Sequence, residues 1–112
     1  MTTARVIIKR PDEKIGHIAN INTDKENIDK HIGGAGMVHI LFDSEDGRVG
    51  IIYKMATSDE DEMNMVYGSF PFRKVVKGTA IVCELGANGD LIDLRALTKK
   101  QWETLLRKWG NL

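Results

Sequence analysis

The chain has 112 residues, of which 42% are apolar and 29% are charged, and its 16 basic residues balance its 16 acidic ones. This size and composition predict a single folded domain, 1–112, and argue against a disordered chain. The lack of an apolar run of about 20 residues argues against a membrane helix, and the zero net charge disfavours nucleic acid as a partner.

The first third of the chain predicts a β-hairpin followed by a short helix. Residues 5–10 and 16–21 are β-branched runs, and the Pro-Asp step at Pro11 between them favours a turn. Thr23 with Glu26 three residues later fits a capping box, so we expect a helix over 24–32. Gly33 and Gly34 would end this helix in a left-handed conformation.

The middle of the chain predicts a second hairpin and then a long loop. Residues 37–42 and 49–53 are apolar and strand-like, and the Asp-Gly step between them favours a turn with Gly47 at positive φ. Residues 54–69 show no periodicity, which predicts a long, mobile loop.

The last third predicts a strand, a turn and an amphipathic helix. Residues 79–85 form the strand, and 86–89 are rich in glycine, as turns are. An apolar stripe at helical spacing then marks a closing helix, and Thr98 with Gln101 fits a second capping box. The order ββαβββα predicts an α+β, two-layer domain with a mostly antiparallel sheet of about five strands. The stripe consists of Trp102, Leu105, Leu106 and Trp109.

The sequence contains no recognisable catalytic or metal-binding pattern. His17, His31 and His39 lack metal-ligand spacing, and we expect Cys83 to be an inert thiol in an apolar strand. The glycines at 33–36 follow a helix, whereas a phosphate loop precedes one. We therefore expect a non-enzymatic protein with no cofactor and no metal.

Several segments resemble a family of short, uncharacterised phage and mobile-element proteins of bacteria, known as a domain of unknown function. These segments are Val6-Ile-Ile-Lys-Arg-Pro-Asp-Glu-Lys-Ile-Gly-His, Val76-Lys-Gly-Thr-Ala-Ile-Val82 and Leu97-Thr-Lys-Lys-Gln101. The resemblance covers most of the chain except 54–72, where Met63-Asn-Met-Val-Tyr-Gly-Ser69 replaces a Pro-Pro-Asn-Arg-like family segment. It implies a cytoplasmic protein of the bacterial host cell with a role in host interaction or counter-defence, and it lends no catalytic residues.

The leading hypothesis is a phage or mobile-element protein that binds a host protein, for example as an inhibitor of a CRISPR nuclease. The acidic, Met-rich loop is the expected contact surface, because flexible thioethers suit adaptable binding. Its expected partner-binding residues are Asp59, Glu60, Asp61, Glu62, Met63, Met65, Tyr67, Phe70, Phe72 and Arg73.

Two other binding functions and one enzymatic function remain open at this stage. The chain could be a homo-oligomer that sequesters a nucleotide, or a weak nucleic-acid-binding accessory protein in which the aromatic residues at 70–72 stack on bases. A general-base pair of His17 with Asp12 or Glu13 would be needed for an enzyme. The residues expected to hold a nucleotide ligand are Arg5, Arg10, Lys14, His17, Arg73 and Lys74.

Overall fold

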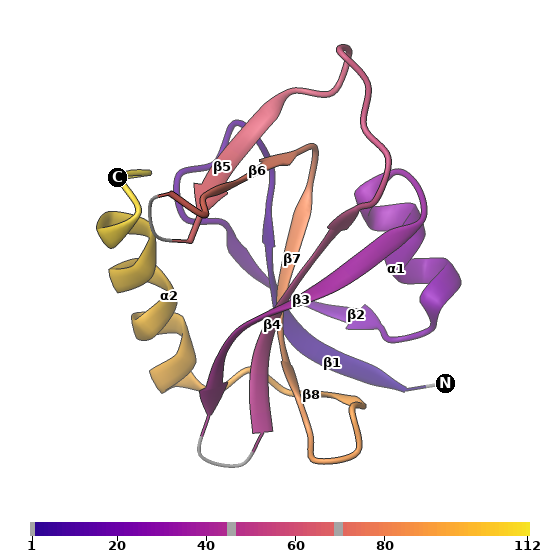
Figure 1. The fold of residues 1–112 in the computed structure, drawn as a ribbon. Coiled ribbons are helices and arrows are strands. Elements are labelled where there is room, and N and C mark those ends of the chain that lie inside the picture. The colour runs from indigo at the N-terminus through magenta and orange to yellow at the C-terminus, as the bar shows by residue number, and fades with distance from the viewer. Residues whose placement is uncertain (1, 45–46, 69–70) are drawn as a thin grey trace.

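The structure is a computed structural model that describes residues 2–44, 47–68 and 71–112. Within these residues the chain forms eight strands and two helices (Figure 1). They are β1 (Thr3–Lys9), β2 (His17–Asn22), α1 (Lys25–Ile32), β3 (Gly36–Ser44), β4 (Gly47–Lys54), β5 (Met63–Tyr67), β6 (Lys74–Lys77), β7 (Ala80–Leu85), β8 (Leu91–Ile92) and α2 (Ala96–Lys108).

The strands form one large sheet and one separate hairpin. The large sheet has the order β2-β1-β7-β4-β3, and the short β8 pairs with β7. The pairs β1–β2, β1–β7, β3–β4, β4–β7 and β7–β8 are all antiparallel. β5 and β6 pair only with each other and lie above one end of the sheet in Figure 1. The predicted α+β class and the mostly antiparallel sheet are confirmed.

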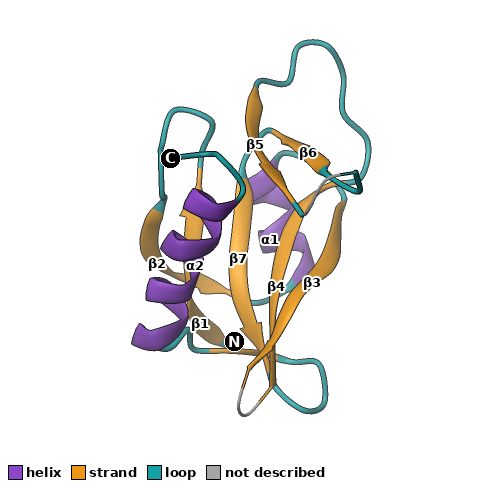
Figure 2. Cartoon of the chain, turned by 60° about the vertical axis from the view of Figure 1, so that its left-hand side comes forward, coloured by secondary structure: helices purple, strands orange, loops and turns teal. Residues whose placement is uncertain are grey.

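The large sheet has an apolar core on each of its two faces. Alternate residues of one strand enter opposite cores, so Ile7 faces α2 while Val6 and Ile8 face α1. Trp102 and Leu106 bring α2 onto the first face, and the hairpin β5–β6 packs on that same face. The structure differs from the predicted two layers in this respect, because its helices lie on opposite faces of the sheet (Figure 2).

Helix α1 lies within the predicted range and ends as predicted. Gly33 has a φ of 86°, in the left-handed region, and its N–H donates to Asp29 O over 2.9 Å. Ile28 and Ile32 point from the helix into the core. An eight-residue helix is too short to be stable alone, so these two contacts hold it on the sheet.

The capping box predicted for α1 does not form. Asp24 occupies the N-cap position without a side-chain bond to the helix. Thr23 instead continues the β1–β2 pairing, because its N–H donates to Thr2 O over 3.0 Å and its hydroxyl donates to the same oxygen over 3.3 Å. The Thr23 hydroxyl is therefore engaged with the sheet.

The capping box predicted for α2 is also wrong. The helix begins at Ala96, with Arg95 at the N-cap position, three residues before the predicted N-cap residue Thr98. Thr98 is completely buried, and its hydroxyl donates to Glu84 Oε1 over 2.5 Å. The apolar stripe was predicted correctly at its centre, where Trp102 and Leu106 are completely buried.

The second hairpin forms, but Gly47 serves a different purpose from the one predicted. Gly47 is absent from the glycines with positive φ among the described residues. A Cβ at this position would lie 2.0 Å from Leu85 O, so a side chain is excluded by the neighbouring strand β7. The turn residues at 45–46 lie outside the described part of the chain.

The predicted loop over 54–69 is wrong in its second half, because β5 occupies Met63–Tyr67. The irregular part between β4 and β5 covers residues 55–62. In β5, Met65 and Tyr67 alternate with partly exposed residues, as in a strand with one face on the core. Asparagine is depleted in strands and methionine is not among the β-branched or aromatic residues enriched there, which explains why the pattern was missed.

Candidate functional site

The structure divides the expected partner-binding residues between the core and the surface. Met65 is 1% exposed and Tyr67 is 7% exposed, so both are core residues and the prediction that they bind a partner is wrong. The side chains of Asp59, Glu60, Glu62, Met63 and Phe72 lie on the surface. Arg73 is exposed, and its guanidinium donates to Trp109 O. Phe70 lies outside the described residues.

Asp61 supports the loop rather than facing a partner. Lys54 Nζ donates to Asp61 Oδ1 over 2.6 Å, and Ser58 N–H donates to Oδ2 over 2.8 Å. These bonds hold the pKa of the Asp61 carboxyl below its usual range, the bond from Lys54 contributing most. Both side chains of the ion pair are less than one-fifth exposed. Asp61 therefore ties the acidic loop to the end of β4.

The outer side of the β5–β6 hairpin carries a group of exposed apolar side chains. Met63 lies directly opposite Lys77, and the side chains of directly opposed residues point to the same side of a hairpin. Side chains two positions apart in one strand also point to the same side, so Val75 shares the side of Lys77. Met63 and Val75 thus point the same way, and Val75 and Met55 line one recess of about 290 Å³. Phe72 lies in the turn between the two strands.

We call Met55, Met63, Phe72 and Val75 the hairpin face. Their side chains are 60%, 59%, 83% and 54% exposed, respectively. Large apolar residues scattered singly are normal on a surface, but a group of them marks an interaction site.

Asn111 and Tyr53 are among the residues whose hydrogen bonds fix the hairpin to the rest of the molecule. Asn111 pairs with the backbone of Val66, accepting from its N–H over 3.0 Å and donating to its carbonyl over 2.7 Å. The Tyr53 and Tyr67 hydroxyls lie 2.8 Å apart in the buried interior. The hairpin face is therefore presented on an ordered scaffold, which lowers the entropy lost on binding.

The residues expected to bind a nucleotide do not come together. Arg5 lies at the start of α2, where its Nε donates to Leu94 O over 3.1 Å. Arg73 lies at the other end of the same helix, at Trp109. Arg10 and Lys14 are exposed in the β1–β2 turn, and Lys74 lines the recess of the hairpin face. Within one chain these residues do not gather at one place, and a nucleotide site between subunits stays a prediction.

His17 and Glu13 form the pair considered for a general base, with Nδ1 and Oε2 2.8 Å apart. Glu13 also accepts from Arg10 N–H over 3.1 Å. Partial desolvation of Glu13 acts to raise its pKa, but the bonds from His17 and Arg10 outweigh it and lower the pKa. Both contacts are local to the β1–β2 turn, so the pair's visible effect is to stabilise that turn.

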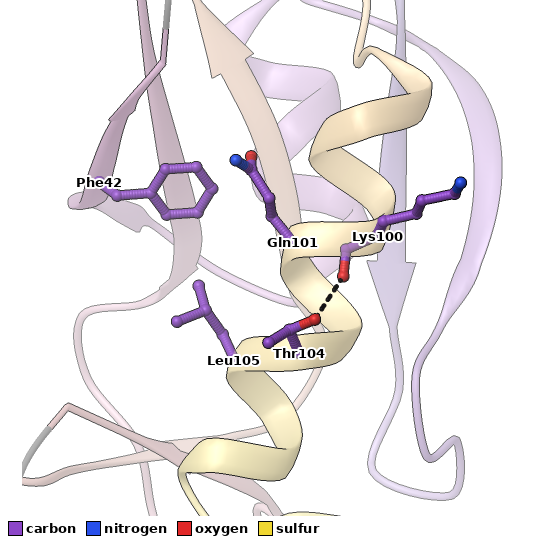
Figure 3. Close-up of a pocket in the computed structure, with 5 residues that line it drawn as sticks. All are labelled: Phe42, Lys100, Gln101, Thr104 and Leu105. Atoms are coloured by element: carbon purple, nitrogen blue, oxygen red, sulfur yellow. Dashed lines mark hydrogen bonds between the residues drawn. The ribbon is translucent and has the colours of Figure 1, made fainter.

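A shallow apolar recess lies between β3 and α2 (Figure 3). Its volume is about 330 Å³, and Phe42 from β3 and Leu105 from α2 face it from opposite sides. Thr104 does not offer its hydroxyl proton to the recess, because it donates to Lys100 O over 3.1 Å. With few polar groups to orient a ligand, the recess suits an apolar side chain.

A larger and more basic groove lies where β1 and β2 meet the start of α2. Its volume is about 550 Å³. The sequence did not predict it, because Arg5 is 89 positions from Leu94 and only the topology brings β1 to the start of α2. It is lined by Arg5, Ile18, Leu94, Arg95, Ala96, Lys99, Lys100 and Glu103.

The chemistry expected of the remaining residues is mostly structural. Cys83 is fully buried, and burial raises the pKa of its thiol to about 12, as expected for an inert thiol. Within the described residues, no three His, Cys, Asp or Glu side chains gather as a metal site would require. Within the same ranges, no helix is both long and apolar enough to cross a membrane.

Comparison of the chain with protein-family models, with curated proteins and with solved structures finds no match.

Proposed function

We propose that this chain is a non-enzymatic binding protein whose hairpin face docks on another protein. The observation that carries the proposal is the exposure of Met63, Phe72 and Val75 on one hairpin, with the exposed Met55 of the preceding loop lining a recess together with Val75. Met and Phe are enriched in the centres of protein interfaces, where they bury much apolar area. The hairpin face therefore supplies apolar contact area, and the β5–β6 hairpin that carries it is ordered before the partner binds.

The charged residues around the hairpin face would orient the partner. Asp59, Glu60 and Glu62 are exposed in the loop before β5, while Lys74 and Lys77 lie on β6. Opposite charges on two sides of an apolar patch favour one docking orientation over others. The proposed partner thus presents basic groups towards the loop and acidic groups towards β6.

The proposal includes the setting that the sequence resemblance implies. The chain would act in the cytoplasm of a bacterial cell, as a phage or mobile-element protein that occupies a host protein. In this setting the chain would inhibit a host defence component, such as a CRISPR nuclease, by covering a surface that the component needs for its activity.

Affinity capture with matched variants tests this function. The tagged protein is incubated with bacterial lysate, captured proteins are identified by mass spectrometry, and each complex is rebuilt from purified components. The double variant Met63→Glu, Val75→Glu should weaken the rebuilt complex by about a hundredfold, since two apolar contacts at an interface are typically worth this much.

The matched control is Val38→Glu, because Val38 is 50% exposed on β3, away from the hairpin. This variant should bind like the unmodified chain. Equal affinity of the double variant, or loss of binding in the control alone, would contradict the hairpin face as the docking surface. Replacing Asp59, Glu60 and Glu62 by the corresponding amides should lower the association rate constant in low salt, because these charges orient the partner. The double variant should act mainly on dissociation, so the two rate constants distinguish the charged residues from the apolar contact.

A further inference from the structure

Strand β2 leaves one edge of the large sheet open. Thr23 N–H donates to Thr2 O, so Thr2 and Thr23 are a hydrogen-bonded pair. Hydrogen-bonded and non-hydrogen-bonded pairs alternate along an antiparallel ladder. The β2 residues whose backbone groups bond to β1 are therefore His17, Ala19 and Ile21. The backbone groups of Ile18 and Asn20 point outwards. Within the described ranges, no strand pairs with this edge.

The opposite edge of the sheet, β3, is partly blocked. Asp29 Oδ1 accepts from the backbone N–H of Gly36 over 3.0 Å, and a register irregularity interrupts the strand between Ile40 and Phe42. A capped end and a bulge are devices that discourage the pairing of an edge strand. The end of β2 is also capped, because Asn27 Nδ2 donates to Asn22 O over 2.8 Å. No register irregularity interrupts β2, however, so its stretch around Ile18 and Asn20 is the better edge for an added strand.

The basic groove lies beside this open edge and on the α2 face of the sheet. Ile18 pairs with Ile7, whose side chain lies in the α2-facing core, and Ile18 lines the groove with 42% of its surface exposed. Arg5 pairs with Asn20, so these two side chains also point to the α2 face. The edge strand thus forms one wall of the groove.

The groove carries cations that the protein itself does not neutralise. Glu84 pairs with Arg95, its Oε2 lying 3.1 Å from Nε. The ion pairs of the described residues include none with Arg5, Lys99 or Lys100, and Glu103 is the acidic residue of the groove lining. An excess of positive charge therefore remains at the mouth of the groove.

We propose that the β2 edge and this groove bind an acidic peptide segment in extended conformation, as an added strand. The outward N–H and C=O groups of Ile18 and Asn20 supply the backbone bonds. Side chains of an added strand alternate in direction, so those opposite Ile18 and Asn20 project over the groove. Carboxylates at these alternate positions meet Arg5, Lys99 and Lys100.

Charge complementarity selects this occupant over a second copy of the chain. The β2 strand has the sequence HIANIN and carries no carboxylate, so pairing of β2 with another β2 would bring two basic grooves together. Like charges across an interface are unfavourable. The surface is distinct from the hairpin face, so either proposal stands or fails without the other.

Titration with synthetic peptides tests the proposal on the full chain. The probe is a short peptide that alternates Glu with Thr, and the matched peptide has the same composition with the Glu residues contiguous. The alternating peptide should bind more tightly by about tenfold. Binding should shift the amide resonances of Ile18 and Asn20 in nuclear magnetic resonance spectra and should be lost when alternate peptide nitrogens are methylated.

The double variant Lys99→Glu, Lys100→Glu should weaken binding by at least about tenfold, because charge repulsion replaces attraction. Its control is Arg107→Glu, Lys108→Glu, which makes the same charge change at exposed positions of the other end of α2. The proposal would be overturned if both peptides bound equally well, if methylation of the peptide had no effect, or if both double variants weakened binding equally. It would also be overturned if inorganic phosphate at equal concentration displaced the peptide, or if no binding occurred at millimolar peptide.

Discussion

Lys9 and Asn64 exchange hydrogen bonds across the junction between the large sheet and the β5–β6 hairpin. Lys9 Nζ donates to Asn64 Oδ1 over 2.6 Å, and Asn64 Nδ2 donates to Lys9 O over 2.8 Å and to Gly78 O over 2.7 Å. Lys9 is only 2% exposed, and its desolvation lowers its pKa, against the opposing effect of the Glu13 and Asp12 charges. The asparagine thus supplies the polar contact that this buried lysine needs.

Asn64→Ala should lower the free energy of unfolding by about 3 kcal/mol, since it removes the side-chain amide that bonds to a buried ammonium group and to two carbonyls. Urea unfolding monitored by tryptophan fluorescence measures this change. Asn20→Ala, at an exposed position of β2, should stay within about 0.5 kcal/mol of the unmodified chain. Equal stability of the two variants would show that Asn64 does not secure the hairpin.

Thr98→Val should destabilise the chain by about 2 kcal/mol, because it removes a hydroxyl donor from the buried Glu84 carboxylate. Thr98→Ser keeps the donor and should recover about half of this loss or more. Thermal unfolding of the three proteins checks the order. A serine variant as unstable as the valine variant would mean that the methyl group, and not the hydroxyl, stabilises this contact.

Stability should fall in acid partly through Asp61. Its pKa is lowered in the folded chain, so the carboxylate contributes stability above the unfolded pKa of about 3.9, and this contribution is lost as the pH falls through the folded pKa. The stability difference between the unmodified chain and Asp61→Asn should therefore be largest near neutral pH and shrink below pH about 4.

Lys54→Met isolates the cause of that shift, because the hydrogen bond from Lys54 lowers the pKa of Asp61 the most. In this variant the pKa of Asp61, followed through its carboxyl resonance, should rise towards the usual value. An unchanged pKa would assign the shift to the Ser58 N–H instead.

Gly47→Ala should destabilise the fold by about 3 kcal/mol, because a Cβ there would lie 2.0 Å from Leu85 O. Gly89→Ala is the matched substitution: Gly89 has a φ of 86° but no atom within 4 Å of an added Cβ, so only the backbone strain of about 1 kcal/mol applies. Urea unfolding separates the two. A larger effect at Gly89 would show that β4 shifts to make room.

The sequence predicted the elements whose side chains repeat at a regular spacing. We could predict the β1–β2 and β3–β4 hairpins, α1 and the buried stripe of α2. In each of them the spacing of the apolar residues indicates which face is buried. β5 was missed because it follows an acidic run, has Val66 as its one β-branched residue and contains one bulge.

Interactions between distant residues were beyond the sequence patterns. Thr23 and Thr98 fit capping boxes locally, yet each hydroxyl bonds to a group on another element. The hairpin face was predicted in part, through Met63 and Phe72. The basic groove was not predicted, because the neighbourhood of Arg5 and Lys99 depends on the order of strands in the sheet.

The position of β7 between β1 and β4 also bears on how the chain is made. β1 pairs on one side with β2, which follows it closely, but on the other side with β7, where Ile7 lies opposite Val82. During synthesis the first hairpin must therefore wait, with one edge of β1 bare, until most of the chain has left the ribosome. Such delayed pairing slows folding and leaves nascent chains open to aggregation, so a chain truncated before β7 should be a substrate for chaperones.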